Sequence, residues 1–236
     1  MDPIYEEGMI TDREKTCYTY DLIPSTLGEI GVVTGSATRK SRLAGGDKGR
    51  NNKQTASLPG SPALWAGSFK YADGSRFRIR RILLPEDGVS MADRIRHEFP
   101  GVLPAAARGE IARLLEIFLG GKEVDFSAAN LDLDGMKGFV RRTLTACREI
   151  PRGRVITYGG LAAALGAPRA ARAVGNAMAS NPFALIIPCH RVIRNGGGLG
   201  GFGGSGPAMK RRLLEQEGVV FDAQGRVLPG YLFMKP

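Results

Sequence analysis

Cys189 lies among apolar residues and directly before His190, and this pair of residue types can carry out nucleophilic chemistry. A thiol attacks as its thiolate, and a nearby base or cation lowers its ordinary pKa of about 8.5. His190 is a candidate base, and Arg191 and Arg194 add positive potential. Because neighbouring residues of an extended segment point to opposite sides, we expect His190 to act on Cys189 through a water. The alternative is an inert cysteine in the core.

The elements that must position this pair are predicted to form a mostly helical domain over residues 131–221. Its spacing predicts helices at 135–150, 160–166, about 169–179 and 207–218, with an extended piece at 155–158. Pro168 suits the first turn of the third helix. Two short helices joined by a tight turn are typical of a helix-turn-helix, although an ordinary helical hairpin has the same pattern. In the last helix the predicted inward residues are Met209, Leu213 and Leu214, and the outward ones Lys210, Arg211 and Arg212.

A small, strand-rich α/β domain is predicted over residues 16–126, which gives an α+β fold overall. Strands are expected at 18–23, after the turn in 26–33, and at 76–84, and helices at 90–99 and 105–119. Residues 34–60 are rich in Gly, Ser, Asn and Lys and indicate a basic, solvated insertion, with a nucleic-acid-binding segment as the alternative. Residues 222–236 form a tail in which 230–233 could pack as a strand.

Positive charge is concentrated around Cys189. The chain has a net charge of +10, and no Asp or Glu occurs between Ile150 and Leu214. This span contains Arg152, Arg154, Arg169, Arg172, Arg191, Arg194, Lys210, Arg211 and Arg212. A cationic field of this kind attracts a polyanion, most simply nucleic acid.

Several other classes of protein are disfavoured by the sequence. The acidic start lacks an apolar signal segment, and no apolar run is long enough for a membrane span. The 3 cysteines are widely spaced, which is typical of a reducing compartment, so we expect a cytoplasmic protein, or a nuclear one in a eukaryote. Residues 198–203 satisfy the dinucleotide pattern G-x-G-x-x-G, but no βαβ unit surrounds them.

The segment Pro188-Cys189-His190-Arg191-Val192 is similar to the active-site signature of the O6-alkylguanine-DNA alkyltransferases, also called methylated-DNA–protein-cysteine methyltransferases. The similarity continues through the region 131–221 and is faint before it. Further segments resembling the family are Arg154–Tyr158, Leu161-Ala162, Ala171–Met178, Asn181-Pro182, the glycine-rich loop at 195–206 and Leu213–Gly218.

The resemblance implies a suicide repair protein that takes a methyl or alkyl group from O6-alkylguanine in DNA, with O4-alkylthymine as a further candidate substrate. Cys189 would be the nucleophile and alkyl acceptor. His190 would activate it through a water, and Glu217 would orient His190. Asn181 would fix the hinge and the water, and Tyr158 would donate a proton to the leaving guanine.

The remaining site residues also follow from the resemblance. Arg172 and Ala171 begin a recognition helix that enters the minor groove, where the arginine replaces a flipped base. The helix ends with Met178, and the glycine-rich loop contributes Phe202 as a wall and Gly203 as a backbone donor. The backbone carbonyls of Cys189 and Val192 would accept hydrogen bonds from the exocyclic amine of the guanine. The implied protein is monomeric, uses no cofactor and binds no metal, because Cys17 and His97 are too few for a zinc site.

Three other functions share parts of this pattern. A Cys-His hydrolase would use the same nucleophile but would turn over. A non-reactive alkyltransferase-like protein would bind the lesion without an acceptor cysteine, and a regulatory helix-turn-helix module would leave Cys189 inert. An alkyltransferase would gain the mass of one alkyl group per chain when it is incubated with alkylated DNA. None of the three alternatives would do so.

Overall fold

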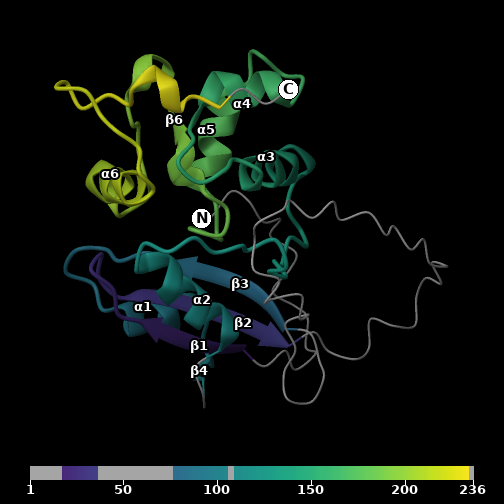
Figure 1. Ribbon diagram of the computed structural model, residues 1–236. Helices are drawn as coiled ribbons and strands as arrows, with labels where there is room; N and C mark the ends of the chain where they lie inside the picture. Colours follow the sequence, from purple (N-terminus) through teal and green to yellow (C-terminus); the bar gives the residue numbers. More distant parts are fainter. Residues whose placement is uncertain (1–17, 37–76, 106–108, 234–236) are drawn as a thin grey trace.

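A four-stranded sheet and a group of helices make up the two parts of the chain (Figure 1). The structure is a computed structural model that describes residues 18–36, 77–105 and 109–233. The insertion expected at 34–60 therefore lies almost wholly outside the described residues, as does Cys17. The predicted α+β fold, with its strand-rich first part and its mostly helical second part, is confirmed. The predicted domain boundaries stay predictions.

The sheet has the strand order β3-β2-β1-β4. Its strands are β1 (Tyr18–Ile23), β2 (Ile30–Ser36), β3 (Phe77–Leu83) and β4 (Leu103–Pro104). β1 and β3 are each antiparallel to β2, whereas β4 is parallel to β1. The register of β2 against β3 shifts between Val33 and Thr34. The first three strands agree with the predicted alternation to within a few residues.

The sheet carries a helix on each of its two faces. Successive side chains of a strand point to opposite faces, so neighbouring apolar residues of β2 can contact both helices. On one face, Val33 packs with residues of α1 (Met91–Glu98). A Cβ at Gly31 would come within 2.7 Å of Ile95 Cδ1, so a larger residue at this strand position would require the side chains of α1 to shift. On the other face, Val32 packs in the cluster that includes α2 (Glu110–Leu119). The prediction that this helix starts at residue 105 is wrong, since its N-cap is Gly109.

The second part contains the predicted pair of short helices. Its helices are α3 (Gly138–Arg148), α4 (Tyr158–Ala164), α5 (Ala171–Ala179) and α6 (Gly206–Gln216). Thr157 caps α4, with its hydroxyl accepting from Gly160 N at 2.9 Å. Pro168 lies in the turn before α5 and not in the first turn of that helix, so this detail was wrong.

A two-stranded parallel sheet connects the helix pair to the cysteine segment. β5 (Ile156–Thr157) pairs with β6 (Val192–Ile193), with Ile156 opposite Val192. β5 leads directly into Tyr158 at the start of α4, and β6 follows the single 3-10 turn η3 (Cys189–Arg191). This short pairing fixes Tyr158 and Cys189 relative to each other.

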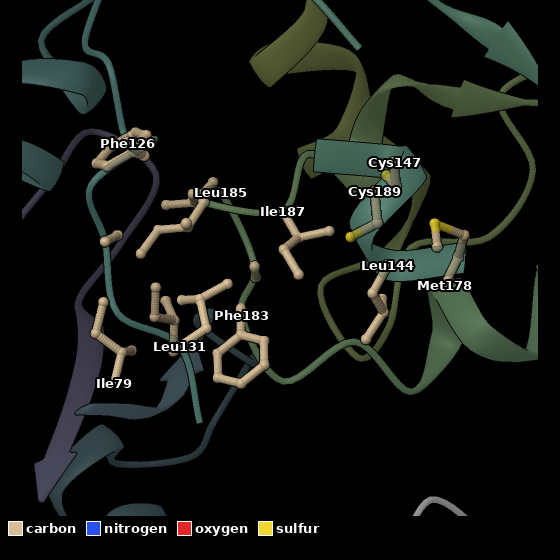
Figure 2. Packing of buried hydrophobic residues seen from close by; sticks show 14 of the residues in the cluster. Ile79, Phe126, Leu131, Leu144, Cys147, Met178, Phe183, Leu185, Ile187 and Cys189 are labelled. Atoms are coloured by element: carbon tan, nitrogen blue, oxygen red, sulfur yellow. The ribbon is translucent and has the colours of Figure 1, made fainter. Parts of the chain in front are cut away.

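One apolar core continues through both parts of the chain. Figure 2 shows Phe183 beside Leu131 and Leu185 towards Phe126, while the same segment leads through Ile187 to Cys189. At that end, Figure 2 groups Cys189 with Leu144, Cys147 and Met178. The segment before the cysteine is thus held by packing from both sides.

The tail packs against the elements next to the cysteine segment. Val155 N donates to Tyr231 O at 2.9 Å, and Phe233 N donates to Val155 O at 2.6 Å. The expected strand at 230–233 is present only as the bridge between Val155 and Leu232, after the 3-10 turn η5 (Pro229–Tyr231). A second turn, η4 (Asn195–Gly197), is held by Val227 N donating to Gly197 O. Within the described parts of the chain, no helix is long and apolar enough to cross a membrane.

Candidate active site

Cys189 begins the 3-10 turn η3, so the expectation of an extended segment at this residue is wrong. The turn forms because Arg191 N donates to Pro188 O at 2.8 Å and Cys189 N donates to Ile187 O at 2.8 Å. Only 7% of Cys189 is exposed, and that surface faces a pocket. The residue is therefore both a member of the core and accessible to a small group in the pocket.

Asn181 holds the turn that carries the cysteine. Its Nδ2 donates to Ile187 O at 3.0 Å and to Cys189 Sγ at 3.2 Å, and its Oδ1 accepts from Phe183 N at 3.0 Å. Between these contacts Leu185 has a φ of 71°, which is strained for a residue with a side chain. The side-chain amide of Asn181 thus bridges the two ends of a tight, strained turn and donates a hydrogen bond to the sulfur of Cys189.

The Cys189 thiol needs a base to ionise. Burial raises its pKa above the ordinary value, and the Asn181 hydrogen bond and the charge of Lys210 only partly oppose this. A buried thiol in such surroundings stays protonated at neutral pH. The base expected from the sequence is therefore needed in the structure as well.

His190 belongs to a buried network of charged groups. Its Nε2 lies 2.8 Å from Glu217 Oε1, and the carboxylate also accepts from Arg191 Nε at 2.9 Å and from Arg191 Nη2 at 2.8 Å. Arg191 Nη1 donates to Ile150 O at 2.6 Å. His190 Nδ1 is buried and has no hydrogen-bond partner among the described residues. The contact with Glu217 assigns the proton to Nε2 and leaves Nδ1 as the basic nitrogen.

The pKa shifts in this network follow from burial and from the ion pair. Burial alone would raise the pKa of Glu217, but His190 and Arg191 outweigh it and lower the pKa to about 2. Burial lowers the pKa of His190, and Glu217 opposes that effect. At neutral pH the resting network therefore contains a carboxylate, a guanidinium and a neutral imidazole.

Many of the residues predicted for the site line a pocket of about 500 Å³. The predicted residues that line it are Cys189, Tyr158, Asn181, Met178, Phe202 and Gly203. Tyr158 retains its proton, because burial raises the pKa of its phenol. The ring of Phe202 meets that of His190 edge-on, with 6.4 Å between centroids. The pocket thus contains a nucleophile, a proton donor and an aromatic wall.

Other predicted residues lie outside this pocket. His190 and Glu217 are buried behind it, while Arg172 is exposed at the start of α5 beside Ala171. Val192 is buried, and its carbonyl accepts from Lys210 Nζ at 2.6 Å. The structure does not bring Arg172 into the pocket itself.

The cationic surface is smaller than the sequence suggests. Arg191 and Lys210 are buried, and Arg152 is directed to the carbonyls of Gly121, Lys122 and Gln216. The prediction that Lys210 faces outward is therefore wrong. The exposed members of the acid-free span are Arg154, Arg169, Arg172, Arg194, Arg211 and Arg212.

Part of the pocket wall comes from the first half of the chain, which the sequence interpretation did not include. Arg81, Leu84, Glu86 and Arg94 line it. Arg94 lies 3.6 Å from Glu86 Oε2 and donates to Leu84 O at 2.8 Å, and Ser205 Oγ donates to Pro85 O at 2.8 Å. The sheet and the glycine-rich loop therefore build one site together.

Comparison with known proteins gives consistent results. A family model for the DNA-binding domain of 6-O-methylguanine DNA methyltransferase matches residues 138–219. A methylated-DNA–protein-cysteine methyltransferase of Methanothermobacter thermautotrophicus is 45% identical over 122 residues, which are 51% of this chain and 67% of the relative.

Solved structures extend the similarity to the first part of the chain. The O6-methylguanine methyltransferase of Mycobacterium tuberculosis is 28% identical, with a TM-score of 0.56 over 85% of this chain and 92% of the other. Mycobacterium tuberculosis OGT in complex with DNA is 29% identical, with a TM-score of 0.56 over 84% and 92% of the two chains. The chain therefore belongs to the family of methylated-DNA–protein-cysteine methyltransferases.

Proposed function

We propose that this protein repairs DNA by direct reversal, moving the alkyl group of O6-alkylguanine irreversibly to Cys189. The observation that carries the proposal is the position of Cys189 on the pocket wall, next in sequence to the buried His190–Glu217 pair. Relatives named methylated-DNA–protein-cysteine methyltransferase, and a relative crystallised with DNA, support the same activity. No catalyst is regenerated, so each molecule reacts once.

The reaction balances with the groups in and behind the pocket. Nδ1 of His190 takes the proton of the Cys189 thiol through a water, and Glu217 stabilises the imidazolium that forms. The sulfur attacks the alkyl carbon, a carbon–sulfur bond forms and the carbon–O6 bond breaks. Tyr158, which stays protonated because burial raises its pKa, donates its phenolic proton to the ring nitrogen of the leaving guanine. The proton taken up by His190 then returns through solvent to the phenol, so that the thiol proton replaces the one given to guanine.

The DNA face of this proposal is the helix pair α4–α5, with the recognition helix α5 in the minor groove and the protein acting as a monomer. The O6 substituent is inaccessible in a stacked duplex, so the base must be flipped out, at a cost of a few kcal/mol. Arg172 lies exposed in the first turn of α5, where it can occupy the place of the flipped base. The other exposed arginines of the acid-free span contact phosphates.

Stoichiometric methylation is the first expected result. Incubated with excess duplex DNA containing O6-methylguanine, the protein is expected to gain one methyl group per chain, on Cys189, and then stop. Intact mass and peptide mass spectrometry measure the amount and the position. Continued release of product beyond one equivalent would instead support a Cys-His hydrolase.

Arg172 and Tyr158 are expected to affect different steps. Arg172→Ala should slow repair of duplex DNA far more than reaction with free O6-benzylguanine, since the free base needs no flipping. Tyr158→Phe should slow both reactions by about a hundredfold or more, because it removes a positioned proton donor. The second-order rate constant of each variant on each substrate provides the test. An equal loss on both substrates for Arg172→Ala would contradict the flipping role.

A further inference from the structure

Lys210 is a cation enclosed in the interior of the second part of the chain. The residue has 0% exposure, and none of the ion pairs among the described residues includes it. Burying a charge without a counter-ion is expensive, so such a residue calls for an explanation. Arg191, the other buried cation near the cysteine, is neutralised by Glu217 and offers no comparable unbalanced charge.

The ammonium of Lys210 is held by groups that surround the pocket. Nζ donates to Val192 O at 2.6 Å and to Gly201 O at 3.4 Å, and it lies 5.7 Å from the centroid of the Tyr158 ring. Val192 follows the turn of Cys189, while Gly201 and Tyr158 line the pocket. These contacts fix the charge on the inner side of the reaction site.

The groups that interact electrostatically with Lys210 come from several elements. They are Cys189 and His190 of η3, Cys147 of α3, Tyr158 of α4 and Arg194 after β6. None of them carries a negative charge in the resting protein, because burial raises the pKa of both thiols and of the phenol. The first anion to form in this group during the reaction is the thiolate of Cys189.

We propose that Lys210 is a positioning residue for alkyl transfer, whose buried ammonium balances the negative charge of the Cys189 thiolate. The inference rests on the proposed function. In the step concerned, the thiol proton passes through a water to His190, and Lys210 keeps its own proton and forms no new bond. The charge is present before the substrate binds, so no reorganisation is needed when the thiolate forms.

Protonation of Lys210 at neutral pH supports this role. Burial lowers its pKa from 10.5 to about 8, while the nearby cysteines oppose the shift. Most molecules therefore hold the charge at pH 7, and the charge is lost as the pH rises through about 8. Since the folded-state pKa is lower than the unfolded one, the charged form costs stability below pH 8. Removing this lysine relieves that cost, which offsets the loss of its hydrogen bonds to Val192 O and Gly201 O.

The test compares Lys210→Met with Lys210→Arg and with the control Arg113→Met, which removes an exposed cation from α2 far from the proposed contacts. The readout is the pH dependence of Cys189 alkylation by iodoacetamide, followed on the Cys189 peptide, together with the rate of methyl transfer from DNA. Lys210→Met is expected to raise the pKa of Cys189 by about one unit and slow transfer at pH 7 by about tenfold. Its melting temperature should equal or exceed that of the unchanged protein, and its affinity for alkylated DNA should be unaltered.

Lys210→Arg should restore most of the thiol ionisation, because it keeps the charge. An unchanged pH profile of Cys189 in Lys210→Met would overturn the proposal, even if methyl transfer were slow. Should Lys210→Met fail to fold, the proposal is overturned as well, because the charge would then be a structural requirement. The iodoacetamide reaction needs no DNA, so a protein that fails to accept methyl groups would refute the proposed function alone.

Discussion

Alanine in place of Cys189 is expected to abolish alkyl transfer completely while the variant still binds DNA containing O6-methylguanine. The pocket is lined by no other cysteine of the described residues, so no second acceptor is in reach. Cys147 is fully buried on α3, and burial raises the pKa of its thiol well above the ordinary value. A thiol of this kind is inert. Binding should survive because the exposed arginines and α5 are unchanged.

Methyl transfer is measured by intact mass, and binding by titration with labelled duplex. The matched controls are Cys147→Ala and Cys17→Ala, which should each still gain one methyl group. Methylation of Cys17 or Cys147 in the Cys189→Ala variant would contradict the assignment of the acceptor. Loss of DNA binding in that variant would show that the substitution disturbs the turn at Asn181.

Elements with strong local signals could be predicted from the sequence, whereas their exact ends could not. The alternation of β3 and the helical spacing of α2 identified both elements. The start of α2 was placed several residues too early, because the alanine-rich residues before Gly109 have high helix propensity of their own. The turn η3 was missed because a single 3-10 turn leaves no periodic pattern.

The orientation of Lys210 could have been predicted from helical spacing. Lys210, Leu213, Leu214 and Glu217 have the spacing i, i+3, i+4 and i+7, which is one face of a helix. Adjacent Arg211 and Arg212 made the residue look like part of a basic surface. The helical spacing alone therefore predicts that Lys210 is buried, whereas the run of three basic residues suggests an exposed surface.

Contacts between distant segments could not be predicted from the sequence. Ser205 and Pro85 are 120 positions apart, and their hydrogen bond joins the glycine-rich loop to the segment that follows β3. Likewise, nothing local to Arg191 indicates that its guanidinium turns inward to Glu217. Such pairings depend on how whole elements pack, which a pattern within one element does not specify.

Glutamine in place of Glu217 is expected to lower both the rate of alkyl transfer and the stability of the fold. The carboxylate accepts from both neighbours in the buried network, so its neutral replacement leaves the Arg191 charge uncompensated. The variant also no longer stabilises the imidazolium of His190. A positioned base typically contributes about a hundredfold or more, and we expect a loss of that order in the rate.

The size of the stability change follows from the pKa of Glu217, which is lowered from 4.5 to about 2. At about 1.4 kcal/mol per unit, this shift corresponds to roughly 3.5 kcal/mol. Because the folded-state pKa is the lower one, this contribution is present above pH 4.5 and is lost as the pH falls towards 2. The difference in unfolding free energy between the unchanged protein and Glu217→Gln should therefore be largest near neutral pH. It should disappear at about pH 2.

Urea unfolding at a series of pH values measures this difference, with Glu215→Gln as the matched control. Glu215 lies on the same helix but is exposed and pairs with Arg211 four residues earlier. Exposed pairs of this kind contribute about 0.3–0.5 kcal/mol, so the control should change little in stability or rate. A Glu217→Gln variant whose unfolding free energy equals that of the unchanged protein at neutral pH would show that the network does not stabilise the carboxylate. One with an unaltered rate would remove Glu217 from the mechanism, because His190 would then act as the base without its partner.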